Sequence, residues 1–357
     1  MSAQDAATTE KLPFDVKELT PEWFSAALSI NSPGTEVAAV EVSHIIWGTA
    51  TKVLVRLDYA ARPADGPPER LCVKGCFDTA LLELGMGPAY SAEAHFYASV
   101  APATAIPAPR SWYARTNPDQ QQGILVLDDL AATGCSFGDP TEPWHPDRVA
   151  AGLEVLAGLH AATAGADRAR YPWLAPQAPV RAVADMFFTP EYWDNHFGGP
   201  DGPPIPDDLR DMKRVLAAFR RLWELEDSAP RAISHGDPHI GNTYIDADGR
   251  PAFLDWQGIC ANPPLDDVAY WIAGALTVED RRAQERALLD HYREALTAAG
   301  STPTSPDQMW QDYRRQHLHG FLWSLTGPRM QPRERVFAMS ERHVAAIEDH
   351  ETLALLT

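Results

Sequence analysis

Two polar segments in the second half of the chain contain residue types that could transfer a phosphoryl group. They are Ser234–Asn242 (SHGDPHIGN) and Phe253–Gln257 (FLDWQ), and a short apolar run typical of a strand adjoins each. Mg²⁺ prefers oxygen ligands and keeps substrate phosphates in its remaining positions, so Asn242 and Asp255 are candidate magnesium ligands. Asp237 is the candidate base, because phosphoryl transfer needs a group that orients the attacking hydroxyl and accepts its proton.

The first of these segments also permits a different chemistry, that of a metal-dependent hydrolase. His235, Asp237 and His239 form an HxDxH pattern that could bind zinc or iron. A helix would bring both histidines onto one face, but Gly236 and Pro238 make a helix improbable there. The later histidines fall in predicted helices far along the chain: His291, His317, His319 and His343. We keep the hydrolase as the alternative prediction.

The first third of the chain has the pattern of a small antiparallel sheet. Thr20–Glu22 combines an N-cap residue, a first-turn proline and an acid, which predicts a helix through Leu28. Alternating, β-branched stretches follow, and Gly and Pro separate them. The predicted strands are Val37–Ile46, Thr51–Tyr59, Arg70–Gly75, Arg110–Ala114 and Gly123–Leu127, with one helix over Tyr90–Val100. We expect residues 1–130 to form a lobe of five antiparallel strands and one inserted helix.

Helical spacing dominates from Ala131 onward. Two short strands, Ala232–Ser234 and Pro251–Leu254, interrupt it around the polar segments. The predicted helices are Pro146–Ala164, Val183–Phe197, Asp207–Glu226, Leu265–Leu276, Val278–Ala298, Gln308–Leu325 and Arg333–Leu355. The sequence therefore predicts an α+β fold of two lobes, in which residues 125–130 join the sheet lobe to a larger helical lobe, 131–357. Ligands commonly bind in a cleft between such lobes.

The order and spacing of the polar residues resemble a known superfamily. His235–Asp237, four further residues and Asn242, followed by Asp255–Gln257, are similar to the catalytic and metal loops of the aminoglycoside phosphotransferase, choline kinase and ecdysteroid-kinase-like superfamily. Pro264–Ala269 resembles the helix start that follows the metal loop in these enzymes. The resemblance implies a protein-kinase-like fold and phosphorylation of a hydroxyl on a small molecule, with ATP and Mg²⁺ as cofactors. A pseudokinase that binds a nucleotide without turnover is a further alternative.

The resemblance extends to a lysine and a glutamate in the first lobe. The chain has only five lysines, and Lys74 lies on a predicted strand in LCVKG. It is similar to the kinase lysine that contacts the α- and β-phosphates. Glu93 lies where the glutamate that pairs with this lysine is expected, and Glu83 is a nearby competitor for that role.

Further nucleotide contacts follow from the same resemblance. Residues 125–130 resemble the hinge whose backbone holds the adenine, which makes Val126 and Asp128 candidate contacts. Gly48 and Thr49 lie in the turn expected to contact the phosphates, where this chain has one glycine instead of GxGxxG.

Two residues are expected to support the catalytic loop. His235 would hold it through hydrogen bonds. Asp267 lies at the predicted helix start after the metal loop, where an acid also stabilises the helix dipole.

The acceptor is expected to bind to the helical lobe, where one predicted helix has an aromatic face. Trp310, Tyr313, His317 and Phe321 share that face, and the first three are the candidate substrate contacts. The alternative is that this face only packs against the protein interior. An exposed aromatic face would suit a hydrophobic or ring-containing alcohol, whereas the acidic composition would suit a cationic acceptor such as an aminoglycoside or choline.

Composition excludes several other functions. The chain has 357 residues, with 30 Lys and Arg against 49 Asp and Glu, and a net charge of −19. Nucleic acids and anionic membranes are therefore improbable partners. No apolar run is long enough to span a bilayer and no signal peptide is visible, so we expect a cytoplasmic protein with its four scattered cysteines as free thiols.

Overall fold

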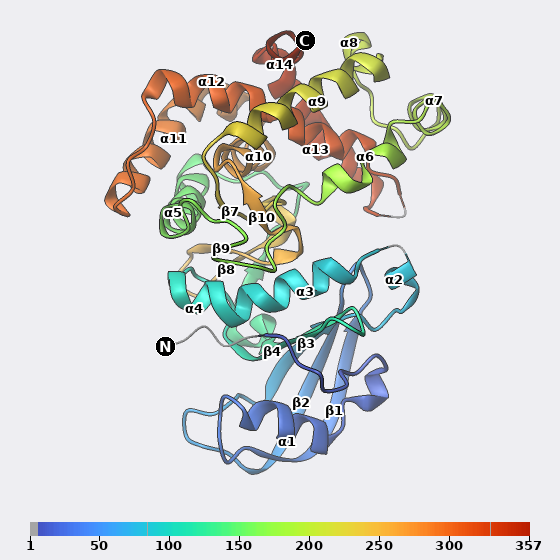
Figure 1. Ribbon diagram of the computed structural model, residues 1–357, viewed down its shortest axis with the longest axis vertical. Coiled ribbons are helices and arrows are strands. Elements are labelled where there is room, and N and C mark those ends of the chain that lie inside the picture. Colours follow the sequence, from blue (N-terminus) through green and yellow to red (C-terminus); the bar gives the residue numbers. More distant parts are fainter. Residues whose placement is uncertain (1–5, 84, 329) are drawn as a thin grey trace. The chain divides into compact units, whose positions relative to one another are not determined.

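The chain forms two compact units, which the computed structural model describes over residues 6–83, 85–328 and 330–357 (Figure 1). Unit 1 comprises the described residues up to Ser136 together with Leu254–Gln257. Unit 2 comprises Phe137–Phe253 and the described residues from Gly258 to Thr357. The candidate residues are divided accordingly, because Asp255 belongs to unit 1 whereas Asp237 and Asn242 belong to unit 2.

A five-stranded antiparallel sheet forms the core of unit 1. Its order is β1-β2-β3-β5-β4, and the strands are β1 (Glu36–Ile46), β2 (Thr51–Ala61), β3 (Arg70–Gly75), β4 (Ser111–Asn117) and β5 (Gln122–Asp128). Val53, Val55 and Leu57 alternate along β2 and are fully or almost fully buried. The five predicted strands are confirmed, with ends that shift by a few residues, because their alternation matches the two faces of a pleated sheet.

Short helices complete unit 1. They are η1 (Val16–Glu18), α1 (Pro21–Ser29), α2 (Ala80–Glu83), α3 (Gly87–His95), the π turn η2 (Phe96–Val100), α4 (Ala101–Thr104) and η3 (Leu130–Thr133). The Thr20 hydroxyl caps α1 by accepting a hydrogen bond from the Trp23 N–H at 3.2 Å. The helix predicted over Tyr90–Val100 is confirmed and lies in the longer run from α3 to α4. It lies close to β5, since a Cβ on Gly123 would be 2.2 Å from the Tyr90 carbonyl oxygen.

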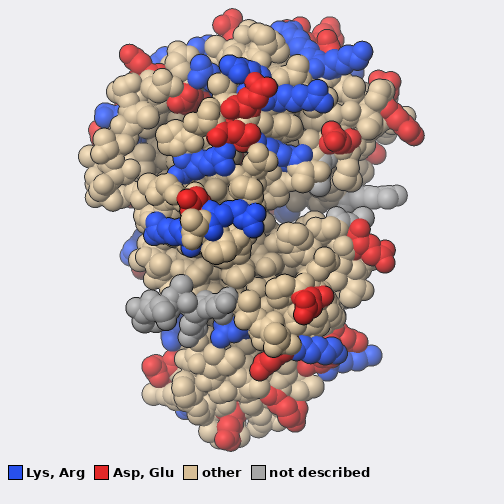
Figure 2. Space-filling view, in the orientation of Figure 1, with Lys and Arg blue, Asp and Glu red and all other residues tan. Residues whose placement is uncertain are grey.

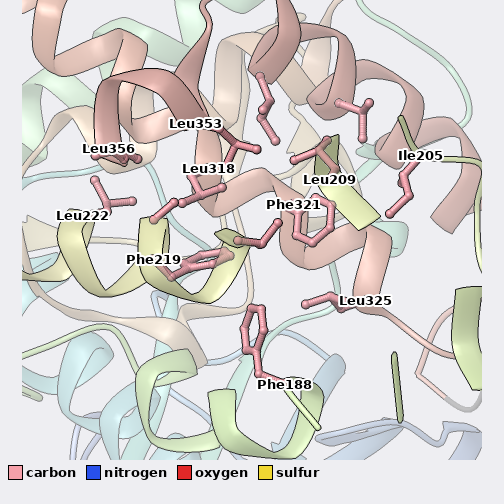
Figure 3. Packing of buried hydrophobic residues seen from close by; sticks show 14 of the residues in the cluster. Phe188, Ile205, Leu209, Phe219, Leu222, Leu318, Phe321, Leu325, Leu353 and Leu356 are labelled. Carbon is pink, nitrogen blue, oxygen red and sulfur yellow. The ribbon is translucent and has the colours of Figure 1, made fainter. Parts of the chain in front are cut away.

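Helices dominate unit 2, and a large apolar cluster joins several of them (Figure 3). Phe219, Phe321 and Leu209 lie in this cluster with almost no exposed surface. The helices are α5 (Pro146–Ala162), α6 (Val180–Phe187), α7 (Pro190–Gly198), α8 (Asp207–Arg210), α9 (Met212–Ser228), α10 (Leu265–Ala275), α11 (Val278–Ala298), α12 (Pro306–Gln316), η6 (His317–Leu325), α13 (Arg333–Asp349) and α14 (Thr352–Leu356).

Four predicted helices are shorter or more divided than expected. The helix predicted over Val183–Phe197 is two helices, because Thr189 caps α7 by accepting from the Tyr192 N–H at 3.2 Å. Asp211 caps α9 in the same way and divides the helix predicted over Asp207–Glu226. The helix predicted over Gln308–Leu325 becomes a 3₁₀ helix from His317, and the one predicted over Arg333–Leu355 ends at Asp349.

Short strands carry the two polar segments. They are β6 (Ser136–Phe137), β7 (Ala232–Ser234), β8 (Thr243–Ile245), β9 (Pro251–Phe253) and β10 (Cys260–Asn262), with the 3₁₀ turns η4 (Ile240–Asn242) and η5 (Trp256–Gly258) beside them. β7 pairs with β10, and a three-stranded sheet has the order β6-β8-β9. The two predicted strands, β7 and β9, are confirmed, whereas β6, β8 and β10 were not predicted. The loop that contains Asp237 therefore begins directly after a buried strand.

The described helices include none that is both long and apolar enough to cross a membrane. Figure 2 shows Lys and Arg side chains gathered over the helix-rich unit and interleaved with Asp and Glu. On this face the excess of acidic residues does not form one continuous acidic area.

Candidate active site

Lys74 is the centre of a buried ion cluster in unit 1. Strand β3 points its side chain into the interior, where only 4% of it is exposed. The ammonium lies 2.7 Å from each carboxylate oxygen of Glu93 and 2.9 Å from Oδ1 of Asp255. The structure thus brings together three predicted site residues and selects Glu93, rather than Glu83, as the partner of Lys74.

Burial and charge act in opposite directions on this cluster. Burial alone would lower the pKa of the Lys74 ammonium, but the Asp255 and Glu93 carboxylates outweigh it, and the pKa is raised. Burial raises the pKa of Glu93, and the Lys74 ammonium opposes that change. Lys74 therefore stays charged at neutral pH.

Asp255 is held in an uncommon backbone conformation. Its φ of 62° lies in the left-handed region, which costs free energy for a residue with a Cβ. The next residue anchors it: the Trp256 ring stacks on Phe96 with centroids 3.9 Å apart, and the Trp256 N–H donates to Glu93 at 3.2 Å. Oδ2 of Asp255 faces Lys52, whose ammonium lies 3.8 Å away, so a second lysine reaches the same carboxylate.

Gly48 and Thr49 lie in the turn between β1 and β2. The carbonyl oxygen of Thr49 accepts a hydrogen bond from the Tyr90 hydroxyl at 2.6 Å, which ties the turn to α3. Gly48 and the Thr49 side chain are exposed. The turn is therefore fixed at its base while its two predicted phosphate contacts remain accessible.

Val126 and Asp128 lie in strand β5. Val126 is fully buried and pairs with β3 on one side and β4 on the other. The Asp128 N–H donates to the Arg110 carbonyl at 3.1 Å, and its carboxylate accepts from the Trp112 indole at 2.8 Å. Both residues thus have structural partners within the sheet.

In unit 2, neutral donors hold the Asp237 carboxylate. The Tyr270 hydroxyl donates to Oδ1 at 2.8 Å, and the Asn242 amide donates to Oδ2 at 3.2 Å and to the Asp237 carbonyl at 3.0 Å. The Trp323 indole N–H in turn donates to the Tyr270 hydroxyl at 2.6 Å. Burial raises the pKa of Tyr270 well above its usual value, so the hydroxyl keeps its proton and acts as the donor. Asp237 itself is 47% exposed and can be reached by a substrate.

A buried carboxylate braces the loop before Asp237. Asp267 accepts the backbone N–H groups of His235 at 2.7 Å and Gly236 at 2.9 Å, and it pairs with His160 at 3.1 Å. Burial would raise the pKa of Asp267, but the hydrogen bond from His160 and the other donors lower it overall. Gly236 has φ 81°, and a Cβ there would lie 2.2 Å from the Gly258 carbonyl oxygen, so the loop requires glycine at this position.

The pattern His235, Asp237 and His239 does not form a metal site in the described part of the chain. Nδ1 of His235 accepts from the Asp237 N–H at 3.3 Å, and Nδ1 of His239 accepts from the Gly241 N–H at 3.0 Å. Backbone groups therefore occupy one nitrogen of each ring. The hydrolase alternative gains no support from this geometry.

Among the described residues, one other cluster has three side chains close enough to share an ion: Glu285, His317 and His350. Oε2 of Glu285 already accepts from Arg281 at 2.9 Å and from the Tyr313 hydroxyl at 3.2 Å, and it lies 3.0 Å from Nε2 of His350. The Arg281 guanidinium thus provides the positive charge that a metal ion would otherwise bring. This cluster is a buried ion pair within unit 2.

The predicted substrate contacts Trp310, Tyr313 and His317 lie beside that ion pair. Tyr313 and His317 are at most 1% exposed, and Trp310 stacks on Tyr313 with ring centroids 5.5 Å apart. Burial lowers the pKa of His317 well below its usual value, so its ring is neutral. These positions favour the packing alternative over contact with an acceptor.

Tyr270 is the contact of Asp237 that the sequence did not reveal. It lies one helical turn after Asp266 in α10, within an apolar run that reads as a buried helix face. The sequence did contain one sign of this contact, a tyrosine within an apolar run, because a buried tyrosine hydroxyl normally has a hydrogen-bond partner. Lys52 ends the predicted phosphate loop, 47–52, but no role was predicted for it.

A family model described as "Phosphotransferase enzyme family" matches residues 88–303, more than half of the chain. A search of curated proteins found no match.

Solved structures share the fold at low sequence identity. Macrolide 2'-phosphotransferase MphH from Brachybacterium faecium is 17% identical, with 94% of this chain and 98% of that chain covered and a TM-score of 0.48. Choline kinase LicA from Streptococcus pneumoniae is 16% identical, with 88% and 94% covered and a TM-score of 0.49. The GDP and kanamycin complex of APH(2")-IIia is 9% identical, with 92% and 98% covered and a TM-score of 0.51. The predicted protein-kinase-like fold is confirmed.

Proposed function

Because this chain belongs to the phosphotransferase enzyme family, we propose that it transfers the γ-phosphate of ATP to a hydroxyl of a small molecule, with Mg²⁺. The observation that carries this proposal is the Lys74 ammonium, which is buried and fixed between Glu93 and Asp255. A buried lysine with two carboxylate partners is a costly arrangement for stability alone. It is well suited to holding a cation at a fixed place for the phosphates of a nucleotide.

In the proposed reaction, Lys74 contacts the nucleotide phosphates and Glu93 fixes its position. The exposed turn of Gly48 and Thr49 provides further phosphate contacts, and residues 125–130, which include Val126 and Asp128, hold the adenine. Lys52 adds a second positive charge near Asp255. These basic groups offset the negative charge of the nucleotide locally, although the whole chain is strongly acidic.

The donor atoms of Asp255 and Asn242 fit a hard cation. Oδ1 of Asp255 accepts from Lys74, and its Oδ2 is 3.8 Å from the partly exposed Lys52. The Asn242 amide nitrogen faces Asp237, which leaves its carbonyl oxygen as a ligand. Each of these oxygens is of the kind that binds magnesium, which would neutralise charge on the β- and γ-phosphates.

Asp237 is proposed to orient the acceptor hydroxyl and to accept its proton. As the hydroxyl oxygen bonds to the γ-phosphorus, the bond between that phosphorus and the bridging oxygen breaks, and ADP leaves with the electron pair. The proton of the hydroxyl passes to the Asp237 carboxylate. Tyr270 and Asn242 hold the carboxylate in one orientation, and His235 and Asp267 support its loop.

The acceptor class is proposed from the relatives, whose names include a macrolide phosphotransferase and a choline kinase. The burial of Tyr313 and His317 removes the sequence-based reason to expect an aromatic surface for the acceptor. We therefore propose a small-molecule alcohol and test several classes: aminoglycosides, macrolides, sterol-like alcohols and choline.

Calorimetric titration with ATP and Mg²⁺ tests the nucleotide site. The wild-type protein should bind ATP, and Asp255→Ala should weaken binding at least about 10-fold, because it removes a proposed magnesium ligand. Asp58→Ala is the matched control, since Asp58 is an exposed carboxylate of the same unit. GTP is titrated in parallel, because the APH(2")-IIia structure contains GDP. Failure of both nucleotides to bind, with stoichiometric binding of zinc, would replace the kinase with the hydrolase.

A phosphorylation screen with isotopically labelled ATP tests the chemistry. Transfer of label to one acceptor class, abolished in Asp237→Asn, would establish the reaction. Nucleotide binding without transfer to any acceptor, and without slow ATP hydrolysis, would favour the pseudokinase.

A further inference from the structure

Unit 2 contains a cavity whose lining residues do not include Asp237. It has a volume of about 540 Å³, within the range of roughly 300–1,000 Å³ that is usual for ligand pockets. The end of α5, the end of α9, the start of α10, and α11 and α12 all contribute to its walls. Segments far apart in the sequence thus enclose one space within a single unit.

The walls of this cavity are largely apolar. Leu222, Leu265, Leu296 and Met309 line it, and each is less than a tenth exposed. Pro263 adds a rigid apolar surface at the start of α10. A wall of this kind gains free energy when an apolar molecule displaces water from it.

Two hydrogen-bond acceptors in the wall favour a ligand that carries a hydrogen-bond donor. Gln316 is 5% exposed, and its Oε1 has no hydrogen-bond partner among the described residues. The Glu226 carboxylate is 4% exposed, and its Oε2 receives the Arg181 guanidinium at 2.5 Å. A buried acceptor without a hydrogen-bond partner is unfavourable. A ligand that carries a hydrogen-bond donor would therefore bind more tightly than a purely apolar ligand of the same shape.

A hydrogen-bond chain connects this cavity to the catalytic loop. Tyr292 and His160 both line the cavity, and the Tyr292 hydroxyl lies 2.8 Å from Nδ1 of His160. Nε2 of His160 lies 3.1 Å from Asp267, which holds the backbone N–H groups of His235 and Gly236. An occupant that packs on Tyr292 and His160 would therefore touch the support of the loop that carries Asp237.

We propose that this cavity binds a small uncharged amphiphile, an apolar body of drug size with one hydroxyl or N–H donor, and that its occupancy stabilises the loop around His235 and Gly236. The donor of the ligand pairs with Oε1 of Gln316, and the apolar body packs against the leucine-rich wall. The binding step is independent of the proposed function, whereas an effect on turnover would rest on it.

The probe is 4-phenylphenol, and its methyl ether, 4-methoxybiphenyl, has the same apolar body without the donor. Calorimetric titration of the full chain should show saturable binding of 4-phenylphenol and at least about 5-fold weaker binding of the ether, for the loss of one hydrogen bond. Gln316→Leu should remove this difference between the probes. Ala164→Trp, which places bulk in the cavity wall just after α5, should abolish binding, whereas Ala162→Trp, at the end of α5 and outside the lining, should not.

Hydrogen exchange supplies a readout for the loop. Binding of 4-phenylphenol should slow amide exchange in a peptide that covers residues 232–242, and Ala164→Trp should prevent this effect. Thermal unfolding of each variant shows that it is folded. Absence of saturable binding to the folded wild type, or binding that survives Ala164→Trp, would overturn the site, and unchanged exchange in the bound state would overturn the link to the loop.

ATP binding is measured on the same samples, so that the two proposals fail separately. Probe binding without ATP binding would contradict only the proposed function. ATP binding without probe binding would contradict only the cavity site.

Discussion

Asp255 in unit 1 accepts a hydrogen bond from a buried ammonium, whereas Asp237 in unit 2 accepts from a tyrosine hydroxyl and a carboxamide. The two carboxylates differ in exposure as well, at 22% for Asp255 and 47% for Asp237. A neighbouring ammonium favours the charged form of a carboxylate more strongly than neutral donors do. The first environment therefore suits a group that must remain an anion beside a cation.

The second environment suits a group that orients an acceptor. The Tyr270 hydroxyl and the Asn242 amide hold Asp237 as uncharged donors, and Nε2 of His239 lies 3.6 Å from its Oδ2. The exposure of Asp237 leaves room for an acceptor molecule. The contrast supports the proposed division of work, in which the Lys74 cluster holds the nucleotide and Asp237 acts on the acceptor.

Removal of the Lys74 ammonium from the buried cluster of unit 1 should have the largest effect on the free energy of unfolding. Lys74→Met leaves Glu93 and Asp255 without their cation, so the free energy of unfolding should fall by about 3–5 kcal/mol. Urea unfolding measures it. Lys74→Met combined with Glu93→Leu should recover part of the loss, because it removes one of the two carboxylates that are left without the Lys74 ammonium.

Lys52→Met is the matched control for that experiment. Lys52 reaches the same carboxylate, but from 3.8 Å and with 38% of its side chain exposed. Its loss should change the free energy of unfolding by no more than about 1 kcal/mol. Equal effects of Lys74→Met and Lys52→Met would show that burial does not distinguish the two lysines.

Stability measured as a function of pH should sharpen the comparison, because unit 2 also contains a buried ion pair, His319 with Asp266. Burial would lower the pKa of His319, but the Asp266 carboxylate outweighs it and raises the pKa to about 9. A histidine whose pKa is raised in the folded state contributes its full stabilisation when the pH is below 6.5, the pKa of the unfolded chain. This contribution to the free energy of unfolding is lost as the pH rises to about 9. The expected slope is about 1.4 kcal/mol per pH unit between those values.

Urea unfolding between pH 7 and 9 isolates this contribution. Burial raises the pKa of Glu226 to about 7, so that group affects the slope mainly below this range. His319→Gln should flatten the slope between pH 7 and 9. A wild-type stability that stays constant over this range would contradict a charged His319 in the folded state.

Tyr270→Phe should produce the smallest of these effects, on catalysis rather than stability. The hydroxyl only orients Asp237, so we expect kcat to fall about 10-fold, consistent with one lost hydrogen bond, with an unchanged KM for ATP. Steady-state kinetics at one pH measures both constants. An unchanged kcat in a folded Tyr270→Phe protein, or a KM for ATP that rises together with the loss of kcat, would contradict an orienting role for this hydroxyl.

Local patterns in the sequence predicted much of the fold. Alternating, β-branched residues between Gly and Pro breakers predicted the first three strands of unit 1. The strands β4 and β5 were predicted as well, but β5 is buried along almost all of its length and so is not marked by alternation. The helix breaks at Thr189 and Asp211 were missed, although both residues are good N-caps. Apolar periodicity continued across them, and a local pattern does not show that the chain turns there.

In the candidate site, too, the residues with local sequence signals could be predicted and those that depend on tertiary packing could not. Asp237, Asn242 and Asp255 could be proposed because their types and spacing are local features. The bond between Tyr270 and Trp323 joins residues 53 positions apart and depends on how α10 and η6 pack. For Tyr313 and His317, periodicity correctly predicted a shared face, but only the tertiary structure shows that this face is buried.

The most direct test of the account compares ATP affinity and turnover in Asp237→Asn. This nearly isosteric change keeps the size of the side chain but removes the carboxylate that would accept the proton. The account predicts that the dissociation constant for ATP with Mg²⁺ changes by less than about 2-fold while turnover falls about 10²–10⁴-fold. Turnover close to that of the wild type, or loss of ATP binding in a folded Asp237→Asn protein, would contradict the separate roles of the two carboxylates.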